Sequence, residues 1–227
     1  FLMAGKSGLN LTKDESLSDF AANFQEAEPW LSPLLADFGP KQVIQFAQDL
    51  DQSVFTGSSG RVFPDVLKAS PFLRAWVQRL DRGGVQFRTG WRWTGWEGRA
   101  LTFATPNGPA QIEPDATVFA LGGASWARLG SDGHWAKNFV EQGVSLSPFG
   151  ASNAAVAIDW SDHMSPYSGT PLKSVSFAAG QYNSRGEAIL SKNGLEGGGI
   201  YSISRGVREG EDLFVDLKPD WTLEKVQ

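Results

Sequence analysis

The segment "ATVFALGG", residues 116–123, is a continuous apolar run that ends in two glycines. Runs of this kind are typical of strands that are buried on both faces of a sheet. The next segment, "GHWAKNFVEQGV" at 133–144, has helical spacing and a glycine stop. We therefore expect a buried strand at Thr117–Leu121 that leads through a glycine turn into a helix.

Residues 85–114, "VQFRTGWRWTGWEGRALTFATPNGPAQIEP", alternate apolar and polar side chains between turns that contain glycine. The Asn107-Gly108 pair is a strong hairpin signal. We expect an antiparallel meander here. Strand, meander, buried strand and helix in this order favour an α/β nucleotide-binding architecture.

Helices are predicted at 28–39, at 40–50 and at 71–82 in the first part of the chain. Pro40 opens the second of these helices, and Gly39 closes the first. The third has Ser70 as its predicted N-cap and Gly83-Gly84 as its stop. The apolar run Phe1–Ala4 is predicted to be a buried strand.

The composition changes near residue 152. From there to the end, short strands and glycine-rich turns replace helical periodicity, as in a separate β-rich domain. We expect one domain over 1–152 and a second, inserted β-rich domain over 153–227. Phe1 starts within an apolar run, and "KPDWTLEKVQ" starts a helix that stops after one turn. These ends predict an internal fragment of a longer protein.

The overall composition excludes several functions. The net charge of −5 without a Lys/Arg cluster argues against nucleic acid and anionic membrane surfaces as partners. The absence of cysteine excludes disulfides and thiolate sites and suits a cytoplasmic location. His134 and His163 are too isolated in the sequence to predict a metal site.

The loop that begins at Gly5 allows more than one interpretation. Gly5-Lys6-Ser7 matches the end of a Walker A motif, whose first glycine would precede Phe1. A truncated P-loop nucleotide-binding protein is therefore one alternative, and a plain turn after a strand is another.

A third interpretation rests on four segments in order: "FLMAGKSGLNLT", "GRVFP" before "KAS" and a helix, "VFALGGASWARLGSDGHWAKNFVEQG", and "RGEAILSKNGLEGGGIYSIS" before "VDLKPD". This series resembles the bacterial FAD-binding flavoproteins of the aminoacetone oxidase family, over nearly the whole chain. The resemblance implies a two-dinucleotide-binding-fold type NAD(P)/FAD-dependent oxidoreductase. Its fold would be an α/β flavin-binding domain, an incomplete Rossmann-like fold with an antiparallel meander, plus the inserted β-rich domain.

The resemblance implies that the first loop wraps the pyrophosphate and ribityl portion of FAD. Gly5, Asn10 and Thr12 match the family pattern, whereas Leu9 replaces a cysteine and Gly8 an arginine. Lys6 and Ser7 replace glycines, and Lys6 could supply the cation that Gly8 lacks. The implied FAD-binding residues of this loop are Gly5, Lys6, Ser7, Gly8, Asn10 and Thr12.

The remaining segments carry the other implied site residues. The Gly60–Pro64 loop would approach the isoalloxazine ring, with Arg61 as the implied catalytic residue and Gly60, Arg61, Val62 and Phe63 as FAD contacts. Trp93 would bracket the adenine. At "FALGG" the small residues Ala120, Gly122 and Gly123 would let the backbone approach the cofactor, although Leu121 replaces a threonine.

The family's GxGxxG turn is not found in these 227 residues. The resemblance implies that it lies upstream, so the fragment itself is not expected to be active. The implied function is hydride transfer between a small-molecule substrate and FAD, with NAD(P)H as a possible electron partner. Substrate, acceptor and oligomeric state stay open.

Each of these segments also has a structural interpretation that needs no FAD. Arg61 could be a solvated loop residue, "FALGG" a tight turn, and the two histidines cap or surface residues. The tryptophans of "GWRWTGWEG" could also form a β-rich ligand- or carbohydrate-binding module without catalysis. That module would require Trp91, Trp93 and Trp96 on one exposed face.

Overall fold

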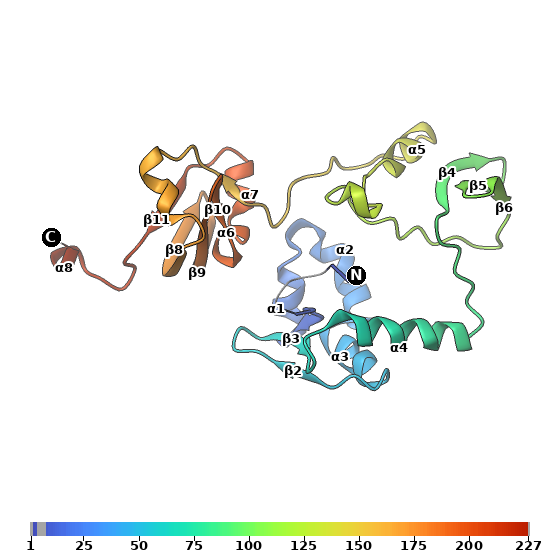
Figure 1. Cartoon of the computed structure of the whole chain (residues 1–227), viewed down its shortest axis with the longest axis horizontal. Coiled ribbons are helices and arrows are strands. Elements are labelled where there is room, and N and C mark those ends of the chain that lie inside the picture. The colour runs from blue at the N-terminus through green and yellow to red at the C-terminus, as the bar shows by residue number, and fades with distance from the viewer. Residues whose placement is uncertain (1, 4–7, 227) are drawn as a thin grey trace. The chain divides into compact units, whose positions relative to one another are not determined.

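The computed structural model describes residues 2–3 and 8–226. Its contacts divide the chain into two compact units, Phe1–Thr89 and Gly90–Gln227, whose elements are labelled in Figure 1. Among the described residues, no helix has the length and apolar character needed to cross a membrane. Each unit has its own core and is described separately.

The first unit combines short helices with a three-stranded antiparallel sheet in the order β1-β3-β2. Its elements are β1 (Thr12–Lys13), α1 (Leu17–Ala22), the 3-10 helix Gln25–Ala27, α2 (Glu28–Asp37), α3 (Pro40–Gln48), β2 (Val54–Thr56), β3 (Arg61–Pro64) and α4 (Ala69–Arg82). The three helices predicted for this region are confirmed within a few residues.

Two helix starts differ from expectation. Helix α4 begins at Ala69 with Lys68 as its N-cap, so Ser70 lies inside the first turn. Helix α1 was not predicted, although its cap is visible in the sequence: the Ser16 hydroxyl accepts a hydrogen bond from the Asp19 backbone N–H at 3.1 Å. Helix α3 starts as predicted, since Gly39 precedes Pro40 and its N–H donates to Gln42 Oε1 at 3.1 Å.

An aromatic core holds helices α3 and α4 of the first unit together. The ring of Phe46 lies 6.1 Å from that of Phe72 and 5.5 Å from that of Trp76, measured between centroids. Buried Leu9 and Leu50 pack into the same cluster, together with Val54 of β2. Helix α4 therefore packs against α3, and Leu9 holds its loop in the same core.

The predicted meander is confirmed in the second unit. Strands β4 (Arg92–Glu97), β5 (Ala100–Thr105) and β6 (Gly108–Ile112) form an antiparallel sheet, with the second hairpin at Asn107. The helix predicted over 133–144 is also confirmed as α5 (Trp135–Glu141), and Gly143 follows it with φ +77°. A 3-10 helix, Ala127–Leu129, precedes it.

A β-bulge in β4 organises the tryptophans of this sheet. The register shifts between Trp93, opposite Phe103, and Gly95, opposite Thr102, and Gly95 adopts φ +134°. Because the bulge adds one residue, Trp93 and Trp96 lie on the same side of the sheet, with ring centroids 4.6 Å apart. Trp93 also packs against Phe119 and Phe139 at 4.8 and 5.5 Å.

Two predicted strands are wrong. Thr117–Leu121 is irregular and largely exposed, with Val118 91% accessible, because no described strand pairs with it and an unpaired strand leaves its backbone groups without a ladder. Leu2 and Met3 lie in an exposed turn rather than a buried strand, while Phe1 and Ala4 are outside the described residues. All strand pairs among the described residues are antiparallel, so no parallel sheet is seen there.

The rest of the second unit contains a five-stranded antiparallel sheet in the order β11-β8-β9-β10-β7. Its strands are β7 (Val156–Ala157), β8 (Pro171–Ala179), β9 (Tyr182–Ser191), β10 (Gly194–Glu196) and β11 (Leu213–Asp216). The helical elements are the 3-10 helix Asp162–Tyr167, α6 (Gly198–Tyr201), α7 (Ser204–Arg208) and α8 (Leu223–Val226). Buried Phe177, Ile200 and Ile203 centre its core.

This region has the strands and glycine turns that the sequence indicated. The boundary near residue 152 falls within the second unit, in the irregular chain between α5 and β7, and stays a prediction.

Truncation of the aromatic core tests the role of α4. Phe72→Ala removes a ring that is 3% exposed and leaves a cavity, so we expect the free energy of unfolding to fall by about 3–5 kcal/mol. Urea denaturation measures this change. The control Trp30→Ala, at a 71% exposed position of α2, should change stability little; similar losses in the two variants would contradict the proposed core.

Candidate functional site

The first cluster of candidate residues forms where β1 and β3 pair. Thr12 lies opposite Val62, and Lys13 lies opposite Arg61. The Leu11 N–H donates to the Val62 carbonyl at 2.9 Å, and the Asp14 N–H donates to the Gly60 carbonyl at 2.7 Å. Two motifs that are about fifty positions apart in the sequence are thus adjacent in space, which the sequence alone did not show.

Gly8 makes this approach possible. It adopts φ +135°, and a Cβ at this position would lie 2.9 Å from Leu67 Cδ2 and 3.4 Å from Phe63 Cδ1. Any larger side chain, including the arginine of the family pattern, would have to displace Leu67 and adopt a strained backbone. The glycine therefore lets the loop pass close to β3.

The Thr12 hydroxyl has no hydrogen-bond partner among the described residues, although Thr12 is only 8% exposed. A buried hydroxyl without a partner is costly, so such groups are usually satisfied by water or a ligand. This unsatisfied atom lies in the segment that was predicted to bind FAD. The residues present there fit a cofactor that offers a hydrogen-bonding group to Thr12.

The prediction of a loop over Gly60–Pro64 is wrong, because Arg61–Pro64 pairs with β1 and β2 as the central strand β3. Its residues divide into buried and exposed positions. Val62 is fully buried, whereas Phe63 is half-buried and stacks on Phe55 with centroids 5.8 Å apart. Arg61 is exposed and forms no ion pair among the described residues. Its guanidinium is therefore available to a ligand. Asn10 is also exposed, while Gly5, Lys6 and Ser7 lie outside the described residues.

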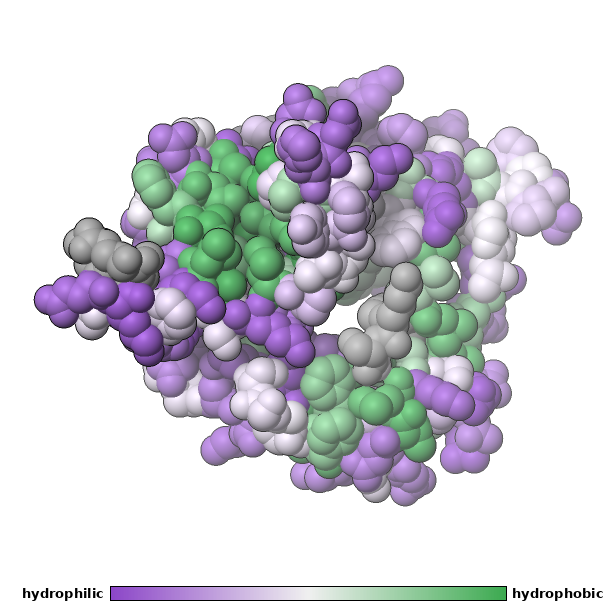
Figure 2. Space-filling view, turned by 60° about the vertical axis from the view of Figure 1, so that its left-hand side comes forward, coloured by the Kyte–Doolittle hydropathy of each residue, from purple (hydrophilic) through white to green (hydrophobic). Residues whose placement is uncertain are grey.

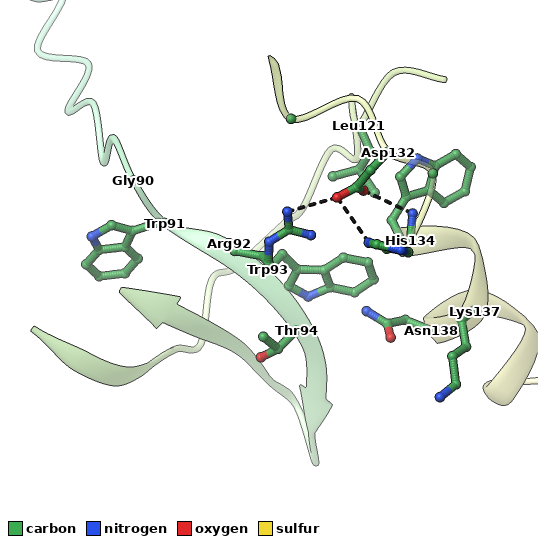
Figure 3. Close-up of a pocket in the computed structure, with 13 residues that line it drawn as sticks. Gly90, Trp91, Arg92, Trp93, Thr94, Leu121, Asp132, His134, Lys137 and Asn138 are labelled. Atoms are coloured by element: carbon green, nitrogen blue, oxygen red, sulfur yellow. Dashed lines mark hydrogen bonds and ion pairs between the residues drawn. The ribbon is translucent and has the colours of Figure 1, made fainter. Parts of the chain in front are cut away.

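A second cluster surrounds a cleft of about 770 Å³ in the second unit. One wall comes from the start of β4, and the other comes from Leu121 and the segment that leads into α5. Figure 3 shows Arg92 and His134 converging on Asp132 at the edge of this cleft, with Trp93 beside them. The cleft combines an aromatic wall with a charged edge, which suits a flat ring that carries polar atoms.

Asp132 organises the charged edge. Its Oδ2 lies 2.8 Å from Arg92 Nη2 and 3.0 Å from His134 Nδ1, and its Oδ1 accepts the His134 backbone N–H at 3.1 Å. The hydrogen bond from Arg92 and then that from the His134 backbone lower the pKa of Asp132 from 3.8 to about 2. Asp132 therefore stays ionised at neutral pH.

The predicted residues of this region are only partly brought together. Trp93 lines the cleft, and its buried Nε1 has no partner among the described residues. The Gly122 carbonyl accepts from Trp135 Nε1 at 3.1 Å, and the Gly123 carbonyl accepts from Ser131 Oγ at 2.8 Å. These bonds fix the glycine turn beside the cleft, whereas Ala120 is simply exposed.

Asp132 and Arg92 are not among the site residues predicted from the sequence. The signal for Asp132 is local, since an aspartate commonly accepts the backbone N–H two residues further on, which here belongs to the N-cap residue His134. Its pairing with Arg92, forty positions away, has no sequence signal. His134 does lie at the N-cap of α5, as the competing interpretation expected.

The condition for a carbohydrate-binding face is not met. Trp91, Trp93 and Trp96 are all half-buried; Trp91 packs on Phe103, and the other two pack on Phe119 and Phe139. Among the described residues, no group of three or more His, Asp or Glu side chains could hold a metal ion.

The Asp132 network predicts a specific pH dependence. Because the folded pKa lies below the ordinary value, its stabilisation is present above about pH 4 and is lost as the pH falls toward 2. Arg92→Gln should raise the pKa of Asp132 toward 3.8, as followed by carboxyl ¹³C NMR. Arg99→Gln, which breaks an exposed pair with Glu113, is the control and should leave this pKa unchanged. An unshifted pKa in Arg92→Gln would refute the network.

Comparison with known proteins gives the family. No curated protein matches the chain. The family model described as "HI0933-like protein Rossmann domain" matches residues 1–206, which include both clusters and most of the five-stranded sheet. The chain therefore belongs to the HI0933-like Rossmann domain family, whose members are FAD-binding domains of the oxidoreductase type.

Proposed function

We propose that the chain contributes to the FAD site of an oxidoreductase that transfers a hydride between a small-molecule substrate and the flavin. The observation that supports this most is the pairing of β1 with β3. It brings the Gly8–Thr12 segment against Gly60–Phe63, where the buried Thr12 hydroxyl has no partner within the described part of the chain. Both segments are those in which the sequence resembles flavoproteins of the aminoacetone oxidase family.

When bound, FAD would supply the redox chemistry, while the protein binds and orients it. In this proposal the Thr12 hydroxyl hydrogen-bonds the cofactor, and Gly8 keeps the loop close enough for that contact. Arg61 places a positive charge near the flavin or the substrate. By resemblance, Trp93 would bracket the adenine, and the Gly122–Gly123 turn would approach the cofactor.

The same proposal extends to the second domain, the electron partner and the cellular compartment. Residues 153–227 would form an inserted domain that shapes the substrate site, and NAD(P)H is a candidate electron partner. The cysteine-free sequence supports a reducing compartment such as the cytoplasm.

Thr12→Val separates a cofactor contact from a purely structural role. The valine is nearly isosteric and removes an unsatisfied hydroxyl, so we expect the FAD-free protein to gain about 1 kcal/mol in stability. At the same time, loss of the hydrogen bond should weaken FAD binding about fivefold. Thermal unfolding and fluorescence titration of the full-length protein measure the two effects.

Thr56→Val is the matched control, since Thr56 lies opposite Val62 on the other side of β3, is exposed, and donates only a long hydrogen bond of 3.4 Å to Asp14 Oδ2. It should not raise the stability of the FAD-free protein and should leave FAD affinity unchanged. Unchanged FAD affinity in Thr12→Val would contradict the cofactor contact. A full-length protein that is folded and supplied with FAD, yet shows no flavin absorption bands, would contradict the function itself.

Arg61→Ala should affect turnover more than cofactor retention. A preorganised cation that stabilises developing negative charge typically accelerates a reaction by a factor on the order of 10²–10³. We therefore expect the rate of flavin reduction to fall by about this factor while FAD stays bound. The measurement is anaerobic flavin reduction by stopped flow in the full-length enzyme. Arg79→Ala, at a cation that lies 5.7 Å from the Phe46 ring in the helical core, controls for general loss of charge in this unit.

Equal reduction rates in wild type and Arg61→Ala would show that Arg61 is only a solvated residue at the start of β3. Loss of FAD from Arg61→Ala would place the guanidinium at the pyrophosphate end of the cofactor instead.

A further inference from the structure

The five-stranded sheet carries an apolar pocket of about 560 Å³ that no flavin contact uses. Residues from all five strands line it: Val156, Leu172, Leu190, Leu195, Leu213 and Val215. Cross-strand pairing places these side chains on one face, because Val156 is opposite Leu195, Leu195 is opposite Leu190, and Val215 is opposite buried Phe177. Since β7 and β11 are the two edges of the sheet, the pocket extends across the whole width of the sheet.

The pocket is deep at one end and open at the other. Leu190 and Leu195 are buried, whereas Val215 is 39% exposed and Leu217 is 58% exposed. Figure 2, in which this sheet comes forward, shows hydrophobic side chains gathered in a patch on this part of the surface. An apolar hollow of this volume lies within the range of small-molecule sites.

A polar pocket of about 740 Å³ adjoins the apolar one. The two share Ala157, Ile158, Trp160 and Met164, so these residues form a common wall. The indole of Trp160 is fixed there, because its Nε1 donates to the Ser191 carbonyl at 3.0 Å. A molecule that bridges the two pockets would pass along this wall.

The polar pocket offers one cation and several neutral groups. Lys192 lines it and forms no ion pair among the described residues, and Ser165, Ser168 and Asn193 lie in the same lining. Asp159 also lines it, so an anionic head group has to bind on the Lys192 side. An apolar hollow beside an unpaired ammonium is a site for an amphipathic anion.

We propose that this pair of pockets binds a small amphipathic molecule, with its apolar chain in the hollow of the five-stranded sheet and its single negative charge at Lys192. The assignment is independent of the flavin function, because it uses none of the residues of either candidate flavin cluster.

The test is calorimetric titration of the full-length protein with decanoate, and with decanol and decyltrimethylammonium as head-group variants. We expect saturable one-to-one binding of decanoate with a negative heat-capacity change, and weaker binding of the other two. Val215→Asp puts a charge into the apolar wall and should weaken decanoate binding at least tenfold. Phe214→Asp, the adjacent and 66% exposed position on the opposite face of β11, should change it less than twofold.

Lys192→Gln should weaken decanoate binding about two- to fivefold and remove the preference over decanol. Lys173→Gln, an exposed lysine of β8 outside both linings, should have no effect. Leu217→Asp gives a second test outside the strand in case Val215→Asp fails to fold.

Absence of saturable decanoate binding, or binding that Val215→Asp and Leu217→Asp leave unchanged, would overturn the proposal. Tighter binding of decyltrimethylammonium would overturn the assignment of Lys192. Binding to anionic vesicles without binding to monomeric decanoate would show a membrane-facing patch in place of a small-molecule site.

Discussion

The backbone pairing of Thr12 with Val62 is the contact on which the first candidate site depends. It needs two supports. The aromatic core of Phe46, Phe72 and Trp76 holds the preceding loop through Leu9, and Gly8 lets that loop pass Phe63 and Leu67 without a clash. Without either support, the two motif segments would not be held side by side. The exposed Arg61 and the unsatisfied Thr12 hydroxyl are consequences of this pairing.

The second cluster depends on a different structural feature, the β-bulge at Gly95 in β4. It turns Trp93 and Trp96 to the same side of the meander, where they pack on Phe119 and Phe139. Phe119 thereby fixes an otherwise irregular segment, and the glycine turn that follows is tied down by Trp135 and Ser131. In the second unit, aromatic packing therefore holds the candidate site residues in place, whereas strand pairing holds them in the first unit.

Local patterns predicted much of this fold. Helices α2, α3, α4 and α5 and the hairpins of the meander follow from caps, proline and glycine positions and alternation, all of which act over a few residues. The apolar run at Thr117–Leu121 was misread, because its composition suits a buried strand but strand formation requires a partner that no local pattern reports. Trp93 and Gly122 were predicted site residues, whereas the Arg92–Asp132 pair depends on tertiary structure alone.

We propose that Gly8–Thr12 and Gly60–Phe63 form one flavin-binding surface. The decisive experiment is hydrogen–deuterium exchange of the full-length protein with and without FAD. We expect FAD to slow amide exchange in peptides covering 8–14 and 57–64 together, with no change at 213–217 in the five-stranded sheet. Binding of FAD that protects neither segment, or only one of the two, would contradict it.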